Sequence, residues 1–302
     1  MSAMNRRAFL LSSASLLAGF GARAAESGLS LGFSLYGMKN LPVEEALKVC
    51  AGIGYRHVEL SLNAGYSTEP KVFSAEARRQ VIGQLEALKL EVPCLMLNLS
   101  LTADAKAHEV ALQSIEQAGL LARELSAKKP PLLETVLGGK PALWEEQKGG
   151  MVEKLRDWAS AAKRVGTVLA VKAHVGSAVN SPERLLWLLE QVPSESLAVT
   201  YDYSHFEIQG MDLERSLRAL LPRTRFLHVK DSTGDVQKYQ FLLPGEGRTD
   251  YVKYFSLLRQ LGYSGPVCVE VSGMIFNKPG YDPVDAAKRS FAALNEALVK
   301  VG

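Results

Sequence analysis

The sequence predicts an α/β fold in which eight parallel strands alternate with helices. Short, nearly continuous apolar runs recur eight times along the chain, and a segment with helical spacing of apolar residues follows each run. Strands that are apolar on both faces are typical of a parallel sheet that is covered by helices. Because eight such strands close into a barrel, we expect a single (β/α)8 TIM barrel over residues 26–302.

Each expected strand is a short run in which Val and Leu recur, and polar or turn-forming residues lie between the runs. In chain order the runs are 30–37, 56–62, 91–99, 131–137, 167–174, 196–202, 225–231 and 265–271. A doubly wound open sheet is the alternative fold. That fold ordinarily has a glycine-rich phosphate turn after its first strand, and the sequence SLYGMKNLP at 34–42 contains no GxGxxG motif.

The expected helices have apolar residues three and four positions apart, and several begin with Ser, Asp or Pro. The clearest examples are 42–54, 74–90, 157–166, 181–192 and 250–263. Their amphipathic pattern predicts that they cover the outside of the barrel.

The N-terminus has the features of an export signal. Arg6 and Arg7 precede a short apolar segment, and residues 22–24 form a cleavage site. The arginine pair resembles a twin-arginine signal, which carries folded proteins. We therefore expect residues 1–25 to be an export signal peptide and the protein to be periplasmic or secreted, with an N-terminal membrane anchor as the alternative.

Composition excludes several classes of partner. The formal net charge is +3, and the expected signal holds three arginines and no acidic residue, so the mature chain is neutral. A nucleic-acid partner is not expected, because its phosphates would need a basic surface. No later segment is long and apolar enough for a membrane span. Cys50, Cys94 and Cys268 lack metal or disulfide spacing and are expected to be buried in one helix and two strands.

Polar side chains gather late in the expected strands, where barrel enzymes carry out their chemistry. They are Glu59, Asn98, Lys172, His174, Asp202, His228, Lys230 and Glu270, with His205 just after its strand. Some of these have a plain structural alternative: a salt bridge at the rim for Glu59, a helix cap for Asn98 and a solvated charge for Lys230.

Asp202, His228 and Glu270 end three successive strands of the expected barrel. One imidazole and two carboxylates at one rim form a set of mixed nitrogen and oxygen ligands. Such a set suits a divalent metal ion, Mn, Zn, Co or Mg.

These motifs resemble the xylose-isomerase-like barrel family, which comprises sugar phosphate isomerases and epimerases, inosose dehydratases and apurinic endonucleases. The resemblance covers nearly all of the mature chain and is strongest in YDYSHF, FLHVKD and LPGEGRTDYVKYFSLLRQLGYSGPVCVEVS. It implies that Asp202, His228 and Glu270 bind a divalent metal. It also implies proton transfer next to a carbonyl of a small-molecule carbohydrate, with Glu270 as the base.

The chain departs from the family pattern on the fifth strand, where Lys172 stands in place of a metal-binding Glu. Strand alternation puts Lys172 and His174 on one face, so Lys172 should point at the metal site. An ammonium group has no lone pair and repels a cation. We therefore expect metal to be bound weakly or not at all, more weakly than in a Lys172→Glu variant and increasingly so as pH falls.

Three functions follow from this set. The main expectation is an exported sugar isomerase, epimerase or lyase in which Lys172 or His174 is the second acid–base group, while Glu59, Asn98, His205 and Lys230 contact substrate. The second is a catalytically silent barrel that binds carbohydrate or a partner protein, in which Lys172 fills the metal position and pairs with Asp202 and Glu270. The third is a phosphodiester hydrolase, which the neutral surface disfavours. His205→Ala should weaken turnover while leaving metal content intact.

Overall fold

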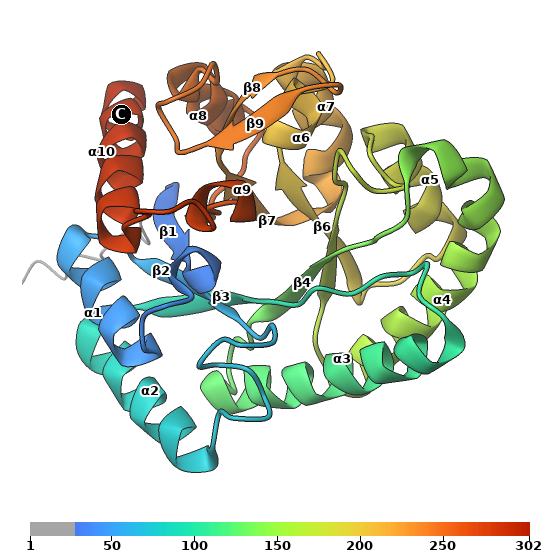
Figure 1. The fold of residues 1–302 in the computed structure, drawn as a ribbon, viewed down its shortest axis with the longest axis horizontal. Coiled ribbons are helices and arrows are strands. Elements are labelled where there is room, and N and C mark those ends of the chain that lie inside the picture. Colours follow the sequence, from blue (N-terminus) through green and yellow to red (C-terminus); the bar gives the residue numbers. More distant parts are fainter. Residues whose placement is uncertain (1–27) are drawn as a thin grey trace, which may run out of the picture.

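The computed structural model describes residues 28–302, so the expected export signal at 1–25 lies outside the described residues. Eight parallel strands form a closed barrel in the spatial order β1-β10-β7-β6-β5-β4-β3-β2 (Figure 1), which confirms the predicted fold. Their bounds are β1 Ser30–Ser34, β2 His57–Ser61, β3 Glu91–Met96, β4 Leu132–Val136, β5 Leu169–Lys172, β6 Leu197–Asp202, β7 Thr224–Val229 and β10 Pro266–Val269. Seven of the expected runs contain one of these strands, and the run 225–231 overlaps β7, which begins one residue earlier at Thr224.

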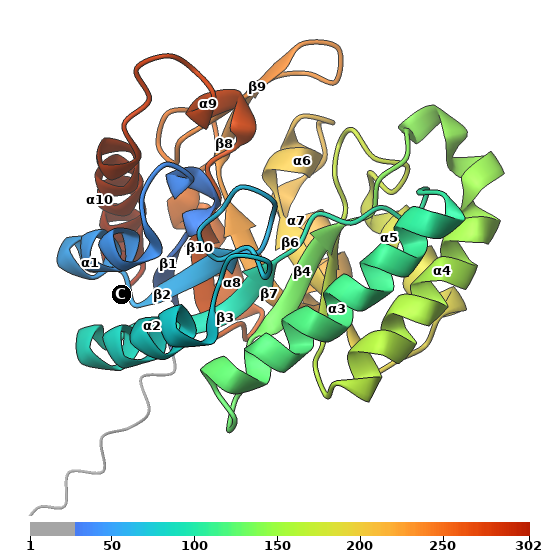
Figure 2. The ribbon, with the colours of Figure 1, turned by 60° about the horizontal axis from the view of Figure 1, so that its bottom comes forward.

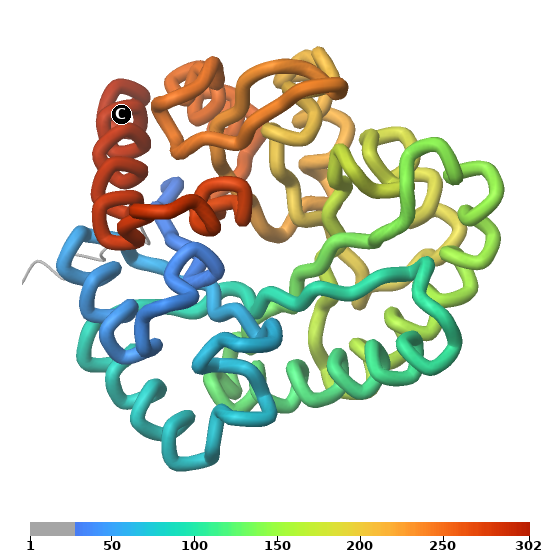
Figure 3. Tube along the Cα trace, in the orientation of Figure 1, coloured from blue at the N-terminus to red at the C-terminus, as the bar shows by residue number. Residues whose placement is uncertain are grey.

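Helices surround the barrel and connect consecutive strands (Figure 1). The longer ones are α1 Val43–Ile53, α2 Ala75–Leu88, α3 Ala105–Leu125, α4 Trp144–Arg164, α5 Pro182–Gln191, α7 Leu213–Leu220, α8 Tyr251–Gln260 and α10 Pro283–Val301. In Figure 3 the chain can be followed to α10, which packs against α8 and α1 and so completes the ring. No described helix is long and apolar enough to cross a membrane.

Side-chain caps fix the starts of several helices. Ser74, Asp104, Ser181 and Asp250 each accept a hydrogen bond from a backbone N–H in the first turn of the helix that follows. Helix α4 differs from the prediction, because it begins at Trp144 rather than at 157. The adjacent pair Gly149–Gly150 lies inside this helix, and glycine disfavours a helix at the sequence level.

The interior of the barrel is apolar at its lower end and charged at its upper end. Cys94, Phe226 and Cys268 form a small buried cluster next to the charged residues, with Cys268 Sγ within 4.8 Å of ligand atoms of Glu59 and His228. Cys50, Cys94 and Cys268 are all free and buried, as predicted. The Phe226 ring lies 5.1 Å from the His228 ring, where the charged layer begins. A packed floor therefore separates the upper mouth from the opposite end of the barrel.

Short elements cover the upper mouth. These are the hairpin β8 Asp231–Gly234 and β9 Tyr239–Leu242, the short helices α6 Ser204–Glu207 and α9 Gly273–Phe276, and the 3-10 turn Leu35–Met38. Figure 2 shows the hairpin beside α9 above the strands, and α9 contacts β9. The remaining 3-10 turns are Pro141–Leu143 and Leu221–Arg223.

Candidate active site

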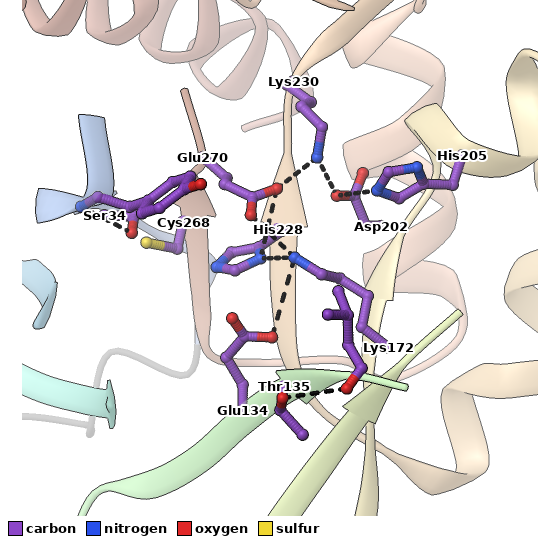
Figure 4. Close-up of polar contacts among 12 residues, drawn as sticks. Ser34, Glu134, Thr135, Lys172, Asp202, His205, His228, Lys230, Cys268 and Glu270 are labelled. Atoms are coloured by element: carbon purple, nitrogen blue, oxygen red, sulfur yellow. Dashed lines mark hydrogen bonds and ion pairs between the residues drawn. The ribbon is translucent and has the colours of Figure 1, made fainter. Parts of the chain in front are cut away.

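Six strands place charged side chains inside the upper mouth of the barrel (Figure 4). They are Glu59 of β2, Glu134 of β4, Lys172 of β5, Asp202 of β6, His228 of β7, and Lys230 and Glu270, which follow β7 and β10. All of them except Glu59 are labelled in Figure 4. Each of these side chains is buried. One ligand atom from each of Asp202, His228 and Glu270 lies within 4.8 Å of the other two, so the predicted convergence of these three residues is confirmed.

Lys172 ends β5 and points into this group. Its Nζ donates to Glu270 Oε1 at 2.9 Å and to His228 Nδ1 at 3.0 Å, and it lies 3.8 Å from Glu134 Oε2. Burial lowers the Lys172 pKa, but the carboxylates of Glu134, Glu270 and Asp202 outweigh burial and raise it. The side chain is therefore an ammonium group at neutral pH.

Lys230 is a second buried ammonium group in the site. Its Nζ donates to both Asp202 Oδ2 and Glu270 Oε2 and so bridges these two carboxylates (Figure 4). It also lies 5.0 Å from the centre of the Phe241 ring. Asp202 is thus paired with Lys230 rather than with Lys172, contrary to the pairing expected for a silent barrel.

The two carboxylates between these lysines are ionised. Burial raises the pKa of Asp202, but Lys230 and His205 outweigh it and hold the pKa well below its usual range. Burial likewise raises the pKa of Glu270, and Lys172 and Lys230 outweigh it. Both carboxylates are weak bases as a result.

His228 is held from both sides of its ring. Its Nδ1 accepts from Lys172, and its Nε2 lies 3.0 Å from Glu59 Oε2. These contacts correspond to the tautomer in which Nε2 carries the proton and donates to Glu59. Burial lowers the His228 pKa, but Glu59 and Glu270 together outweigh burial and raise it.

Glu134 is the one carboxylate of the group whose functional importance the sequence did not indicate. Its Oε2 is buried and has no hydrogen-bond partner. Burial raises the Glu134 pKa to about 7, against the opposing effect of Lys172. A carboxyl group with this pKa exists in both protonation states near neutral pH, which suits a general acid–base group.

His205 and His174 lie beside the charged group with their ring centres 4.1 Å apart. His205 Nε2 is 3.4 Å from Asp202 Oδ2. Burial lowers the His205 pKa to about 4, against Asp202, and burial with His205 lowers the His174 pKa to about 2. Both rings are neutral at pH 7.

A cavity of about 630 Å³ opens above the charged group. Among the described residues, its wall includes Glu134, Lys172, Lys230 and Glu270 but neither Asp202 nor His228. Of the residues expected to contact substrate, Asn98, His205 and Lys230 line this cavity, and so does His174. Glu59 does not line it, because its carboxylate is fully buried against His228.

A larger cavity of about 1320 Å³ lies at the other end of the barrel, around residues at or just before the N-terminal ends of the strands, such as Glu91, Pro131 and Thr167. It contains none of the charged residues at the strand ends. Since barrel chemistry takes place at the carboxyl ends of strands, we assign the site to the smaller, upper cavity.

The site has a possible metal-ligand group in Asp202, His228 and Glu270. In the arrangement observed, however, His228 Nδ1, both Glu270 oxygens and Asp202 Oδ2 are all bonded to lysine ammonium groups. A cation bound by these atoms would lie beside two positive charges, which repel it. The residues therefore do not fit a divalent ion unless the lysine side chains move.

Comparisons with known proteins agree with this architecture. The family model described as Xylose isomerase-like TIM barrel matches residues 47–297. Inosose dehydratase from Geobacillus thermodenitrificans is 26% identical over 186 residues, which cover 56% of this chain and 62% of that protein. Inosose dehydratase from Clostridium perfringens is 25% identical over 150 residues, covering 45% and 50%. The matched regions thus span between half and two thirds of these relatives.

Two solved structures share the fold. A probable 3-DHS dehydratase, AsbF, from Bacillus anthracis has a TM-score of 0.73 at 17% identity, with 88% of this chain and 98% of that chain covered. IOLI protein with a binding zinc atom has a TM-score of 0.74 at 17% identity, with 90% and 99% covered.

Proposed function

Because the chain belongs to the xylose isomerase-like TIM barrel family, we propose that it is a lyase of the dehydratase type that removes water from a polyhydroxylated ketone. The curated relatives matched here are inosose dehydratases, whose name denotes a small sugar-like substrate. These relatives favour the lyase alternative over the isomerase or epimerase that the sequence primarily predicts.

Loss of water from such a ketone needs three chemical roles. A base removes the proton from the carbon next to the carbonyl, a positive group stabilises the enolate oxygen that forms, and an acid protonates the hydroxyl group that leaves from the next carbon. The C–H electrons first form the enolate. They then form the new C=C bond as the C–O bond breaks and water departs.

Glu134 is the proposed base: its side chain is part of the cavity wall, and its buried Oε2 has no hydrogen-bond partner, which is the observation that carries the proposal. Its pKa of about 7 lets it accept the proton and then deliver it to the leaving hydroxyl group. Glu270, the base expected from sequence, has both oxygens bonded to lysines and a lowered pKa. We assign Glu270 the role of holding the lysines in place.

Lys172 is the proposed group that stabilises the enolate oxygen. Lys172 and Glu134 both line the cavity, and Lys172 Nζ lies 3.8 Å from Glu134 Oε2, so one substrate can meet the ammonium and the carboxylate together. An ammonium ion in a water-poor site stabilises a developing negative charge strongly. His174, which the sequence offered as an alternative acid, is neutral at pH 7 and is assigned substrate contact instead.

Aromatic side chains on one side of the cavity support a carbohydrate-like substrate. The Tyr36 ring stacks on the Tyr66 ring at 5.8 Å and meets the Phe276 ring edge-on at 5.0 Å. All three line the cavity together with Asn63 and Asn98. Apolar faces combined with a few amide groups are typical of small-molecule sites.

The test is incubation of the purified protein with an inosose in D₂O, followed by NMR. We expect loss of water, and Glu134→Gln should lower kcat by about 10²- to 10⁴-fold, the usual contribution of a general base. Glu145→Gln, at an exposed position on α4, is the matched control and should keep full activity. Deuterium incorporation without water loss would indicate an isomerase or epimerase instead. Neither reaction, on inososes or related keto sugars, would favour the silent barrel.

A further inference from the structure

Lys172 and Lys230 together carry the charge that a divalent ion would bring to this site. Each side chain is almost completely buried, at 2% and 3% exposed. Lys172 joins Glu270 to His228, and Lys230 joins Glu270 to Asp202. The two ammonium groups therefore connect the same three residues that a divalent ion would connect, and they supply the same charge of two.

From the sequence, only Lys172 is expected in the metal position, and Lys230 is expected to contact substrate. The contacts of Lys230 change this assignment, because it holds an oxygen atom from each of the two carboxylates of the possible ligand group. Replacing Lys172 alone would leave these oxygen atoms bonded to Lys230. Both lysines consequently stand between a metal ion and its ligands.

The cavity wall supports the same conclusion. Lys172 and Lys230 line the cavity, whereas Asp202 and His228 are absent from its wall among the residues that the structure describes. A substrate oxygen that reaches the bottom of the cavity thus meets ammonium N–H groups. It can accept a hydrogen bond from Lys172 while a neighbouring hydroxyl group donates to the unpaired Glu134 Oε2.

We infer that Lys172 and Lys230 form a built-in substitute for the divalent ion, so that this protein holds its substrate and the enolate oxygen without a metal. The assignment of the ligand as a hydroxy ketone rests on the proposed function. The substitution of the metal by the lysine pair rests on the contacts alone, and it is tested without any substrate.

The experiment compares four forms of the purified full chain in their binding of Mn²⁺, measured by titration calorimetry and by metal content after gel filtration. They are the wild type, Lys172→Glu, Lys230→Gln and the double variant Lys172→Glu/Lys230→Gln. We expect the wild type and Lys230→Gln to retain no Mn²⁺ and Lys172→Glu to bind it weakly. The double variant should bind one ion per chain, at least about tenfold more tightly than Lys172→Glu.

Two results would overturn the inference. One is retention of a stoichiometric Mn²⁺ by the wild type or by Lys230→Gln. The other is equal affinity of Lys172→Glu and the double variant, which would remove Lys230 from the substitute. If the double variant does not fold, the wild type and Lys230→Gln still decide, because retention of Mn²⁺ by either overturns the inference and its absence from both supports it. Water loss from an inosose is a separate measurement, so a failed lyase assay leaves these metal results intact.

Discussion

Glu134 couples the chemistry of the site to the stability of the protein. Its pKa is about 7 in the folded chain, whereas an exposed Glu has a value of 4.5. The folded state therefore binds more protons than the unfolded state between these values. The resulting stability is fully present below pH 4.5 and is lost as pH rises through 7.

Glu134→Gln should remove this pH dependence. As pH rises from 5 to 8, the free energy of unfolding of the variant should increase relative to that of the wild type. The change should be at most about 3 kcal/mol for a pKa shift of this size. Denaturant unfolding of both proteins at the two pH values measures the difference. Unfolding free energies that change in parallel would show that Glu134 has an ordinary pKa in the folded protein.

His174 and His205 should remain neutral through the physiological range. Burial lowers their pKa values to about 2 and about 4, below the usual 6.5. Because the unfolded chain binds the extra protons, this contribution to stability is full above pH 6.5 and declines as pH falls through the folded values. NMR of the imidazole signals, assigned with His→Asn variants, should show no titration of either ring between pH 5 and 8. A titration midpoint in that range for either ring would show that burial does not lower the pKa of that ring as described.

The β8–β9 hairpin covers the site, and hydrogen bonds to two acidic side chains hold it in place. Asp231 accepts hydrogen bonds from the backbone N–H groups of Gly245 and Thr249, and Glu207 accepts from Ser232 and Thr249. These contacts connect α6 to the hairpin and to the loop that follows it. Phe241 of β9 in turn reaches Lys230 and the His205 ring.

Gly234 is required at the end of β8. Its φ of +84° is unfavourable for other residues, and an added Cβ would overlap the carbonyl oxygen of Lys238. Gly234→Ala should therefore destabilise the hairpin and lower kcat/KM. Gly262→Ala is the matched control, because its φ is +77° but its Cβ would have no neighbour within 4 Å. Gly262→Ala should lower the free energy of unfolding by only about 1–2 kcal/mol, the cost of placing a residue with a Cβ in the left-handed backbone conformation. Equal losses of unfolding free energy in the two variants would show that the clash at Gly234 is relieved.

The barrel as a whole was predictable because its pattern is repeated. Each strand is a short apolar run and each long helix has its own amphipathic spacing, so the alternation and the count of eight identified the closed sheet. The strand ends then gave Asp202, His228 and Glu270 from sequence order alone. Parallel strands bring their carboxyl ends to one mouth, so no knowledge of contacts was needed.

Glu134 and the role of Lys230 were not predictable in the same way. Glu134 lies in the middle of an apolar strand, paired with Met96, and its lone charge in such a run was the available signal. Whether its side chain reaches the site depends on strand register, which the sequence does not state. Lys230 bridges Asp202 and Glu270 only because the closed barrel brings β6, β7 and β10 side by side.

A crystal structure of the wild-type protein grown with excess Mn²⁺, with data collected for anomalous scattering, tests the lysine-for-metal arrangement most directly. We predict no anomalous peak between Asp202, His228 and Glu270, with Lys172 Nζ within hydrogen-bond distance of Glu270 and His228, as observed here. An anomalous peak coordinated by those three residues, with Lys172 turned away, would contradict the account.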